Sequence, residues 1–583
     1  MWHTHLRCAA HHNKHNKIMK FRNILAAAVL LLSLNGAYAQ ADIAGRLMGL
    51  SYFDITDMAN FAQTNYTSGT ARSAAMGGAF TSLGADLSTM SINPAGLGMY
   101  QSSDIGVTLS VLNNRTSVKG NGASVQMIDK NQTPMKFNNV GFAFNVWDGS
   151  GALTNINLGI SYNTLASYNS TATYEVKGQP ISIADVMINQ LYQMKNSGIT
   201  QDMMNSSSEP FGNHNIYMSE WGSVLAYQTE LVYGEADGSY SLHRSLSDYA
   251  KTNSRLTTRT RGGSGDFEFS VGGNVSNILY FGASLGVRSV DYVENNYYEE
   301  AYTDNTVEYP IQFMMYDQNV KVTGSGFNGK FGLTLRPIGG LRVGVAVHTP
   351  TFLSLSKYYS ASMRANFKEA NGFNDVTKTT PTNSYSYNYT TPARLLTGVS
   401  YTFGQWGVLS ADYERVWYNG MRLKSVASDV ADNYKRQIKE HYKAGNNLRV
   451  GLEVKPTAWL SLRGGFGVQG NFLRAMADSN GQMVSGELAM FNDYDAPVAY
   501  KTTHGTAGVG FRFNTVYVDL AYVYSKTSYT PYMMYYFYNP ADTDPNNVPV
   551  SQVGQNAAGE SYTLTYGQDI VRHGVMVTFG LRF

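Results

Sequence analysis

Short segments in which apolar and polar side chains strictly alternate recur along most of this chain. In the last segment, Gly574, Thr578 and Arg582 lie between apolar residues, which are Val575, Val577, Phe579, Leu581 and Phe583. Successive side chains of a β-strand point to opposite faces, so each segment has one apolar and one polar face. The alternation predicts an all-β protein whose sheet keeps apolar side chains on one surface.

Fourteen segments follow this pattern, and their length suits a membrane. We expect strands at residues 104–113, 138–147, 154–164, 264–275, 279–290, 326–336, 341–349, 393–403, 407–417, 447–456, 459–469, 505–514, 516–526 and 573–583. A strand of about 9–11 residues crosses a bilayer when it is tilted. Single-chain bacterial barrels have an even number of antiparallel strands. Residues 103–583 therefore predict a transmembrane antiparallel β-barrel of about 14 strands with long extracellular loops.

The connections between these strands alternate in length. We expect short turns at Asn277-Ile278, 337–340, 404–406 and Asn514-Thr515, whereas long polar loops separate the other pairs, the longest at 165–263. Bacterial outer-membrane barrels have short periplasmic turns and long extracellular loops, and a soluble β-protein has no reason to sort its loops by end. This asymmetry predicts that the protein lies in the bacterial outer membrane.

Two of the long loops have distinctive content. The longest predicts a helix with Ser182 as its N-cap, and its later apolar stretch, Trp221–Tyr233, fits a strand above the membrane. Residues Tyr529–Tyr538 are rich in tyrosine and methionine. Such apolar loops either pack on one another as a cap or form an entrance for apolar molecules.

The composition excludes a polyanionic partner. Charged residues make up 15% of the chain and the formal net charge is +2, so we expect no binding to nucleic acid. The mean hydropathy of -0.25 agrees with a barrel, because only every second strand residue faces lipid.

The N-terminus predicts export. A basic start at Met19–Arg22 precedes an apolar run at Ile24–Leu34, and Ala37-Tyr38-Ala39 has small residues where a signal peptidase cleaves. We therefore expect residues 1–39 to be a signal peptide, with Met19 as the true start.

Residues 1–18 contain five histidines and the only cysteine, Cys8. A metal-binding tail is one interpretation, and a start codon placed too early is the other. On the second interpretation the mature chain has no thiol, which excludes disulfides and cysteine metal sites. We expect no cofactor and no metal in the mature protein.

The stretch before the first strand lacks the strand pattern. It contains two runs rich in small residues, Ala71–Phe80 and Asn93–Leu97, and Pro94 in the second run blocks continuation of a helix. Small residues allow close backbone packing, and the low charge disfavours a solvated tail. A barrel of this width needs filling. We therefore predict that residues 40–102 form a plug, or hatch, inside the barrel.

These two runs resemble those of FadL-like outer-membrane transporters for long-chain fatty acids and hydrocarbons. In that family a run A-R-x-x-x-M-G-G-A-F precedes N-P-A-G-L within an N-terminal hatch, and a fourteen-stranded barrel follows. The matching positions are Ala71, Arg72, Met76, Gly77, Gly78, Ala79, Phe80, Asn93, Pro94, Ala95, Gly96 and Leu97. The predicted architecture extends the resemblance along the mature chain.

The resemblance implies passive uptake of hydrophobic compounds by a monomer surrounded by outer-membrane lipids. Long-chain fatty acids and aromatic hydrocarbons are the implied kinds of cargo, and the loops that would contact them depart from the family. Cargo would pass from the loops to an apolar pocket and leave through the barrel wall, when the hatch moves together with a kinked strand near the Asn-Pro-Ala corner. The implied hatch and gating residues are Arg72, Met76, Gly77, Gly78, Asn93, Pro94, Ala95 and Gly96.

Two alternatives to transport of apolar compounds remain open. One is a FadL-like barrel that acts as a scaffold or shuttle for surface or secreted proteins, and the other is a porin for polar solutes. A dry, apolar patch near the hatch favours the transporter. An open, charged lumen favours the porin, and a sealed lumen beneath broad apolar loops favours the scaffold.

The chain ends on an aromatic residue, Phe583, and Leu581 and Phe579 precede it at every second position. This pattern resembles the C-terminal signal that barrel-assembly machinery recognises. We expect that machinery as a partner during biogenesis.

Two enzyme-like motifs lie inside predicted strands. Gly324–Lys330 matches a dinucleotide-binding pattern, and Gly282–Gly286 matches a nucleophile elbow. Each motif requires a strand that is followed by a helix, whereas here the alternation continues. We expect neither a phosphate site nor a hydrolase nucleophile.

Two pairs of carboxylates share strand faces, namely Asp266 with Glu268 and Asp412 with Glu414. Such pairs can perform acid–base chemistry. In a barrel we expect them to face the lumen and to bond to basic side chains across the strands, and the candidates are Arg449, Arg463, Arg572 and Arg582. The protein is not predicted to be an enzyme.

Overall fold

A computed structural model describes residues 55–529, 532–534 and 563–583, except for 66, 68, 121–124, 128–129, 133–134, 180–181, 206–209, 212–215, 217–219, 236–237, 239, 242–250, 304, 307, 309 and 475–499. The expected signal peptide, residues 1–39, lies outside the described residues, and so do residues 40–54 of the expected hatch.

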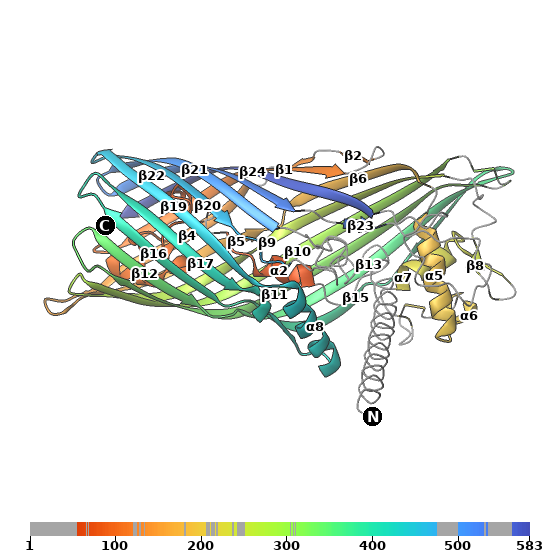
Figure 1. Ribbon diagram of the computed structural model, residues 1–583, viewed down its shortest axis with the longest axis horizontal. Coiled ribbons are helices and arrows are strands. Elements are labelled where there is room, and N and C mark those ends of the chain that lie inside the picture. Colours follow the sequence, from red (N-terminus) through yellow and green to blue (C-terminus); the bar gives the residue numbers. More distant parts are fainter. Residues whose placement is uncertain are drawn as a thin grey trace, which may run out of the picture.

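Fourteen antiparallel strands form a closed ring in the described part of the chain (Figure 1). In ring order they are β1 (Asp104–Gly120), β4 (Met135–Asp148), β5 (Leu153–Ser167), β9 (Lys251–Val275), β10 (Leu279–Thr303), β11 (Ile311–Leu335), β12 (Leu341–His348) with β13 (Phe352–Glu369), β16 (Arg394–Thr402) with β15 (Asn383–Thr390), β17 (Gly407–Trp417), β19 (Ala444–Thr457), β20 (Leu460–Gln469), β21 (Tyr500–Phe513), β22 (Val516–Tyr529) and β24 (Thr563–Arg582). The ring closes where β24 pairs with β1, from Asp104 with Arg582 to Gly120 with Tyr566. All fourteen predicted segments lie in this ring, which confirms the fold class.

Two strands of the ring are split at a proline. β12 and β13 separate at Pro350, and β15 and β16 separate at Pro392. Proline cannot donate to a strand ladder. Threonine hydroxyls complete the bonding beside the first split, because Thr349 Oγ1 accepts from the amide of Gly329 at 2.8 Å and Thr391 Oγ1 accepts from the amide of Thr351 at 2.8 Å. The wall therefore stays closed at this height.

The outer surface of the ring carries an apolar band. Phe267, Val287, Phe327 and Phe352 lie in one row across four neighbouring strands, and all four are exposed. On β19, Leu448 and Val450 are exposed, whereas Arg449 between them is buried. Lipid requires apolar side chains outside and paired backbone groups within the wall. The protein is therefore a transmembrane barrel of the outer-membrane type.

Three strands continue far beyond this band. β9, β10 and β11 each have 25 residues, whereas about ten cross a bilayer. Beyond the apolar row the outward positions of β10 become polar, at Ser289 and Asp291. The predicted segments stopped at this change because apolar alternation defined them. The three strands thus form a tall extracellular wall.

Three helices lie beside this wall at the end of the barrel away from the C-terminus: α5 (Ile183–Asn196), α6 (Gln201–Asn205) and α7 (Trp221–Gln228) (Figure 1). Helix α5 confirms the helix predicted after Ser182, whose Oγ accepts from the amide of Ala184 at 3.1 Å. The strand predicted at Trp221–Tyr233 is wrong, because α7 occupies most of it. Every residue from Trp221 to Ala226 is buried, so no apolar periodicity separates helix from strand there.

The helices share one hydrophobic core with the inner faces of β10, β11 and β13 and with α2 (Ile55–Ala62). Trp221 is central to it, with its ring centroid 5.9 Å from that of Tyr359 and 5.3 Å from that of Phe211. This part of the long loop therefore packs as a cap. Of residues 529–538, the structure describes only Tyr529 and 532–534.

The remaining strands and helices outside the lumen are short or peripheral. They are β2 (Val125–Met127), β3 (Lys130–Gln132), β6 (Ser170–Gln179), β7 (Tyr233–Gly234), β8 (Tyr240–Ser241), β14 (Gly372–Thr379), β18 (Arg422–Lys424), β23 (Tyr532–Met534), η4 (Tyr418–Gly420) and α8 (Ser428–His441). Among the described residues, no helix is long and apolar enough to span a membrane.

The apolar band yields a stability prediction. Leu285→Arg places a charge on the lipid-facing side of β10, where Leu285 is 57% exposed, and we expect a loss of about 2–4 kcal/mol. Phe373→Arg is the control, because Phe373 is 69% exposed on β14, beyond the band, and should cost less than about 0.5 kcal/mol. Equilibrium unfolding from phospholipid vesicles measures both. Equal costs would show that Leu285 does not face lipid.

Candidate functional site

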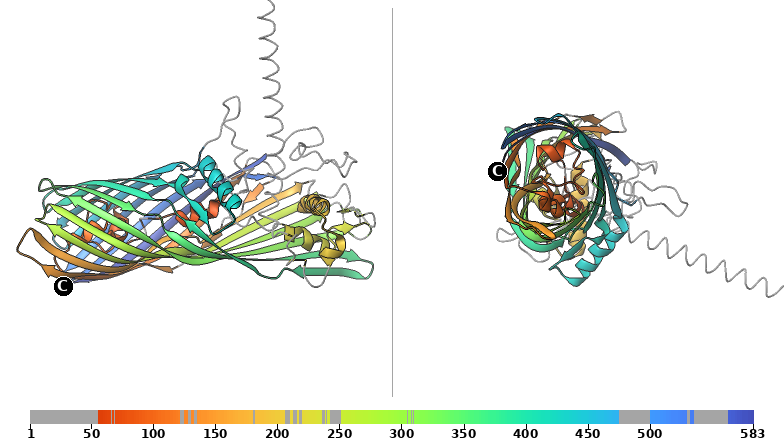
Figure 2. Two further views of the ribbon diagram at one scale, coloured as in Figure 1. Left: turned by 90° about the horizontal axis from the view of Figure 1, so that it is seen from below. Right: turned by 90° about the vertical axis from the view of Figure 1, so that its left-hand side faces the viewer.

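The hatch fills the lower lumen. It consists of α3 (Ala71–Ala75), α4 (Thr89–Ile92) and η2 (Pro94–Met99), which lie inside the ring when the barrel is viewed along its axis (Figure 2). From Ala71 to Tyr100 every residue is buried except Arg72, Ala85 and Met99, which are half-buried. Passage straight through the lower barrel therefore requires movement of the hatch.

The first motif ends in a tight turn against the wall. Thr70 caps α3, because its Oγ1 accepts from the amide of Ser73 at 3.1 Å. After Met76 the chain turns through Gly77 and Gly78, whose φ angles of 66° and 75° favour glycine. A Cβ on Gly465 of β20 would lie 2.2 Å from the nitrogen of Gly77. The wall therefore contacts the hatch backbone directly.

The second motif forms a corner against β10 and β11. Asn93 Oδ1 accepts from the amide of Ala95 at 3.1 Å and so caps η2, whose first residue is Pro94. Asn93 Nδ2 donates to the carbonyl of Thr81 at 2.5 Å, which ties the two motifs together. A Cβ on Gly332 of β11 would lie 1.8 Å from Asn93 Oδ1.

Arg72 ties the hatch to the wall by charge. Its Nε lies 3.0 Å from Glu453 Oε2 on β19, and its guanidinium lies over the ring of Phe80, 5.3 Å from the centroid. Glu453 also binds Arg463 at 2.6 Å, and Arg463 continues to Asp519 at 2.5 Å. Breaking a buried pair of this kind leaves an uncompensated charge. The network therefore resists displacement of α3.

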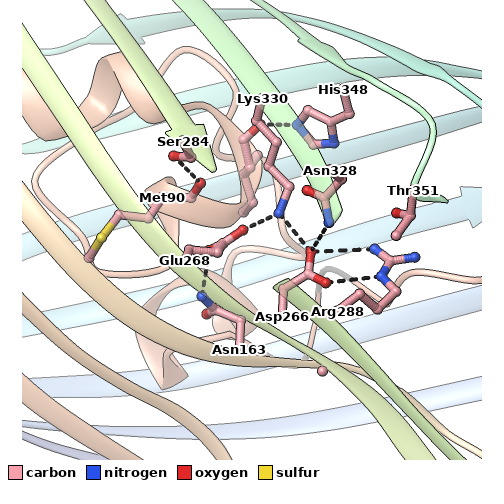
Figure 3. A network of polar contacts seen from close by, with 12 residues as sticks. Met90, Asn163, Asp266, Glu268, Ser284, Arg288, Asn328, Lys330, His348 and Thr351 are labelled. Atoms are coloured by element: carbon pink, nitrogen blue, oxygen red, sulfur yellow. Dashed lines mark hydrogen bonds and ion pairs between the residues drawn. The ribbon is translucent and has the colours of Figure 1, made fainter. Parts of the chain in front are cut away.

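A second network lies on the side of the second motif (Figure 3). Asp266 binds Arg288 at 2.9 Å and Lys330 at 3.0 Å, and Lys330 also binds Glu268. The hatch contributes carbonyl groups here, because Ser284 Oγ donates to Met90 at 3.1 Å and His348 Nε2 lies 2.9 Å from the carbonyl oxygen of Ile92. Two acids and two bases thus balance in charge.

The predicted partners of the carboxylates are found in part. Glu414 binds Arg449 at 2.9 Å, as expected, and also Arg394 at 2.9 Å. Asp412 instead accepts from the amide and the hydroxyl of Thr81 in the hatch, at 2.8 and 2.7 Å. Arg582 binds Asp104 at 2.7 Å, where the chain end closes the ring. These carboxylates therefore serve as partners in structural hydrogen bonds and ion pairs.

Both enzyme-like motifs lie within continuous β-strands. Gly324–Lys330 lies within β11 and Gly282–Gly286 within β10. A Cβ on Gly282 would lie 2.3 Å from the carbonyl carbon of Pro94, so this glycine faces the lumen and makes room for the corner. The strand-to-helix turn that a nucleophile requires is missing at this site.

A cavity lies beside the hatch in the upper lumen. It contains about 930 Å³ of space free of atoms, open solvent included, and its lining joins hatch residues 63–65 and 67 to seven strands of the wall. Leu112, Val523 and Met576 give it an apolar side, whereas Lys136, His504 and Arg572 give it a basic side. The expected dry, apolar pocket is therefore an amphipathic one.

Beside this cavity, the backbone hydrogen-bond ladder between two strands of the wall is interrupted. The ladder between β4 and β5 runs from Asp148 with Asn155 to Asn139 with Asn163 and ends there. Beyond that point β4 has a bulge against β1 at Asn138, and β5 has one against β9 at Leu165. The same stretches line the cavity, through Asn138 and Thr164 among others. We call this place the wall break.

The wall break coincides with an interruption of the alternating sequence pattern. The predicted segments 138–147 and 154–164 end at the wall break, because two successive residues of like kind interrupt the alternation there. Asn138 and Asn139 are both buried, and so are Leu165 and Ala166. A bulge places neighbouring side chains on one face. The Asn-Pro-Ala corner lies instead against β10 and β11, so it does not touch this irregularity.

Comparison with known proteins gives a likeness of fold. No protein-family model and no curated protein matches the chain. Similar solved structures include the toluene transporter TodX of Pseudomonas putida, with 12% identity over 88% of this chain and 98% of that chain and a TM-score of 0.44. They also include the toluene transporter TbuX of Ralstonia pickettii (14%, 90%, 100%, TM-score 0.43) and a FadL homologue of Pseudomonas aeruginosa (11%, 89%, 98%, TM-score 0.45).

The contact at Gly332 yields a test of the corner. Gly332→Ala must push Asn93 away. The reporter is a cysteine at position 97, introduced by Leu97→Cys together with Cys8→Ser. We expect this cysteine to react with a maleimide about tenfold faster when Gly332→Ala is present than when it is absent, a change equivalent to about 1.4 kcal/mol. Gly329→Ala is the matched control in the same strand, because a Cβ there has no neighbour closer than 3.6 Å. Equal reactivity of the two variants would mean that the contact does not hold the corner.

Proposed function

We propose that this protein admits hydrophobic compounds through the outer membrane, by passive diffusion from the upper lumen through the barrel wall. The observation that carries the proposal is the wall break beside the cavity, above a lumen that the hatch fills. A ligand in this cavity is adjacent to the membrane at the one height where β4 and β5 share no ladder in the described residues. The motifs in the hatch, which resemble those of FadL-like transporters, point in the same direction.

The lateral route has a physical advantage for apolar cargo. Met135 and Phe137 border the wall break and are 67% and 62% exposed on the outer face of β4. A compound that leaves between β4 and β5 therefore meets apolar side chains and then lipid, and it never has to enter water. No nucleotide is required for such diffusion. Arg72, Met76–Gly78 and Asn93–Gly96 would fix the hatch as the floor of the cavity.

One alternative retains a specific observation in its favour. The cap helices and the tall wall of β9–β11 build a packed extracellular body, which is what a scaffold or shuttle for surface proteins would present. The porin has no comparable support, since paired charges and the hatch occupy the described lower lumen. Retention of apolar compounds in the cavity separates the transporter from the scaffold.

Filling the cavity tests the proposal. Solvent extraction of the purified protein followed by lipid mass spectrometry should detect an apolar compound in the wild type. Ser525→Trp puts an indole into the cavity, and we expect about tenfold less of that compound, equivalent to about 1.4 kcal/mol of binding. Ser289→Trp is the control, because Ser289 is exposed on the outer face of β10.

Two outcomes decide between the candidates. A compound that is retained by the wild type and by Ser289→Trp but lost from Ser525→Trp supports uptake through the cavity. A wild-type protein that neither retains nor binds apolar compounds would overturn the proposal and favour the scaffold.

A further inference from the structure

One basic side chain bridges the wall break. Lys136 lies on β4 between the exposed residues Met135 and Phe137, so its own side chain points towards the lumen, where it lines the cavity. Its Nζ donates to Ser167 Oγ at the end of β5 at 2.7 Å and to the carbonyl of Gly262 on β9 at 3.4 Å. The side chain therefore spans the place where the backbone ladder is missing.

Two further side chains make hydrogen bonds at the wall break. Thr164 Oγ1 donates to the carbonyl of Phe137 at 2.8 Å. Further out, Asn114 of β1 donates to the carbonyl of Asn169, two residues beyond the end of β5. Between these two bonds the wall is closed by side chains, and the ammonium of Lys136 is the charged group among the contacts described there.

We infer that Lys136 is the gate residue of the wall break: its side chain closes the exit, and it must swing away before a ligand can pass between β4 and β5. This inference rests on the proposed function and deepens it. Side-chain hydrogen bonds are suited to this role, because each contributes little net free energy and can break without disturbing a strand. A lysine also has a long, flexible stem, so its ammonium can rotate without moving β4.

A lysine that merely stabilises the wall would behave differently. Its removal would lower the free energy of unfolding and leave the rate of ligand exit unchanged. A gate residue changes the exit rate, and a covalent bridge in its place must slow exit. The rate of exit therefore distinguishes the two roles.

The first test uses pyrene, an uncharged hydrocarbon, as the probe. The full-length mature protein is loaded with pyrene and mixed with phospholipid vesicles, and the transfer of pyrene to the vesicles is followed by fluorescence. We expect transfer from Lys136→Met to be about tenfold faster than from the wild type, since two hydrogen bonds across the wall break are lost. Lys136→Arg keeps the charge and the donors and should restore a slow rate.

The second test replaces the contact by a covalent bond. In a Cys8→Ser background, Lys136→Cys with Ser167→Cys removes the hydrogen bond and should release pyrene as fast as Lys136→Met. Bridging the two cysteines with a short bis-maleimide should slow release to the wild-type rate or below it. The unbridged double variant is the control for folding, because both samples contain the same protein.

The outcomes separate the inference from the proposed function. Pyrene that never enters the wild-type protein would overturn both. Pyrene that enters and leaves the wild type, Lys136→Met and the bridged protein at one common rate would overturn the role of Lys136 alone, and it would place the exit elsewhere in the barrel.

Discussion

The structure depends on one constraint: within a lipid bilayer, each backbone amide and carbonyl must find its partner inside the protein. The closed ring satisfies it, with β24 paired to β1 along the whole of β1. At two places where the ladder is interrupted, side chains take its place. Threonine hydroxyls do so beside Pro350, and Lys136 and Thr164 do so at the wall break. The two places differ, because short, stiff threonine side chains alone act at the first, whereas a long, flexible lysine side chain joins a threonine at the second.

The hatch is held by two kinds of contact that act at different ranges. Close backbone contact requires glycine in the wall, as at Gly332 and Gly465, so the fit is steric and local. The ion pair of Arg72 with Glu453 holds the hatch by charge, and the ion pairs of Asp266 balance charges within the wall beside it. Balanced charges keep a buried lumen free of an unpaired ion, which would be costly. Together these contacts fix the hatch to the barrel wall.

The sequence predicts the part of the fold that alternation encodes. All fourteen strands and the helix after Ser182 could be found, because lipid on one side and the lumen on the other impose a period of two. The extracellular wall and α7 could not, since Asp291 no longer faces lipid and Trp221 is buried on every side. The hatch motifs were visible in Arg72 and Asn93, but the cavity was not. It gathers Lys136, His504 and Arg572 from strands far apart in the sequence, and alternation does not fix which residues of such strands lie at one height.

The closure of the ring by the two terminal strands has a consequence for how the protein is made. The hatch is joined directly to β1, and Ser103 exchanges two backbone hydrogen bonds with Phe583, the last residue of the chain. A segment with buried hydrogen bonds to β10, β11, β17, β21 and β24 and an ion pair to β19 has no way into a lumen that is already sealed. The hatch must therefore be in position before β1 and β24 form their hydrogen bonds. This geometry implies that the last step of folding is closure of the barrel wall around a hatch that is already in place.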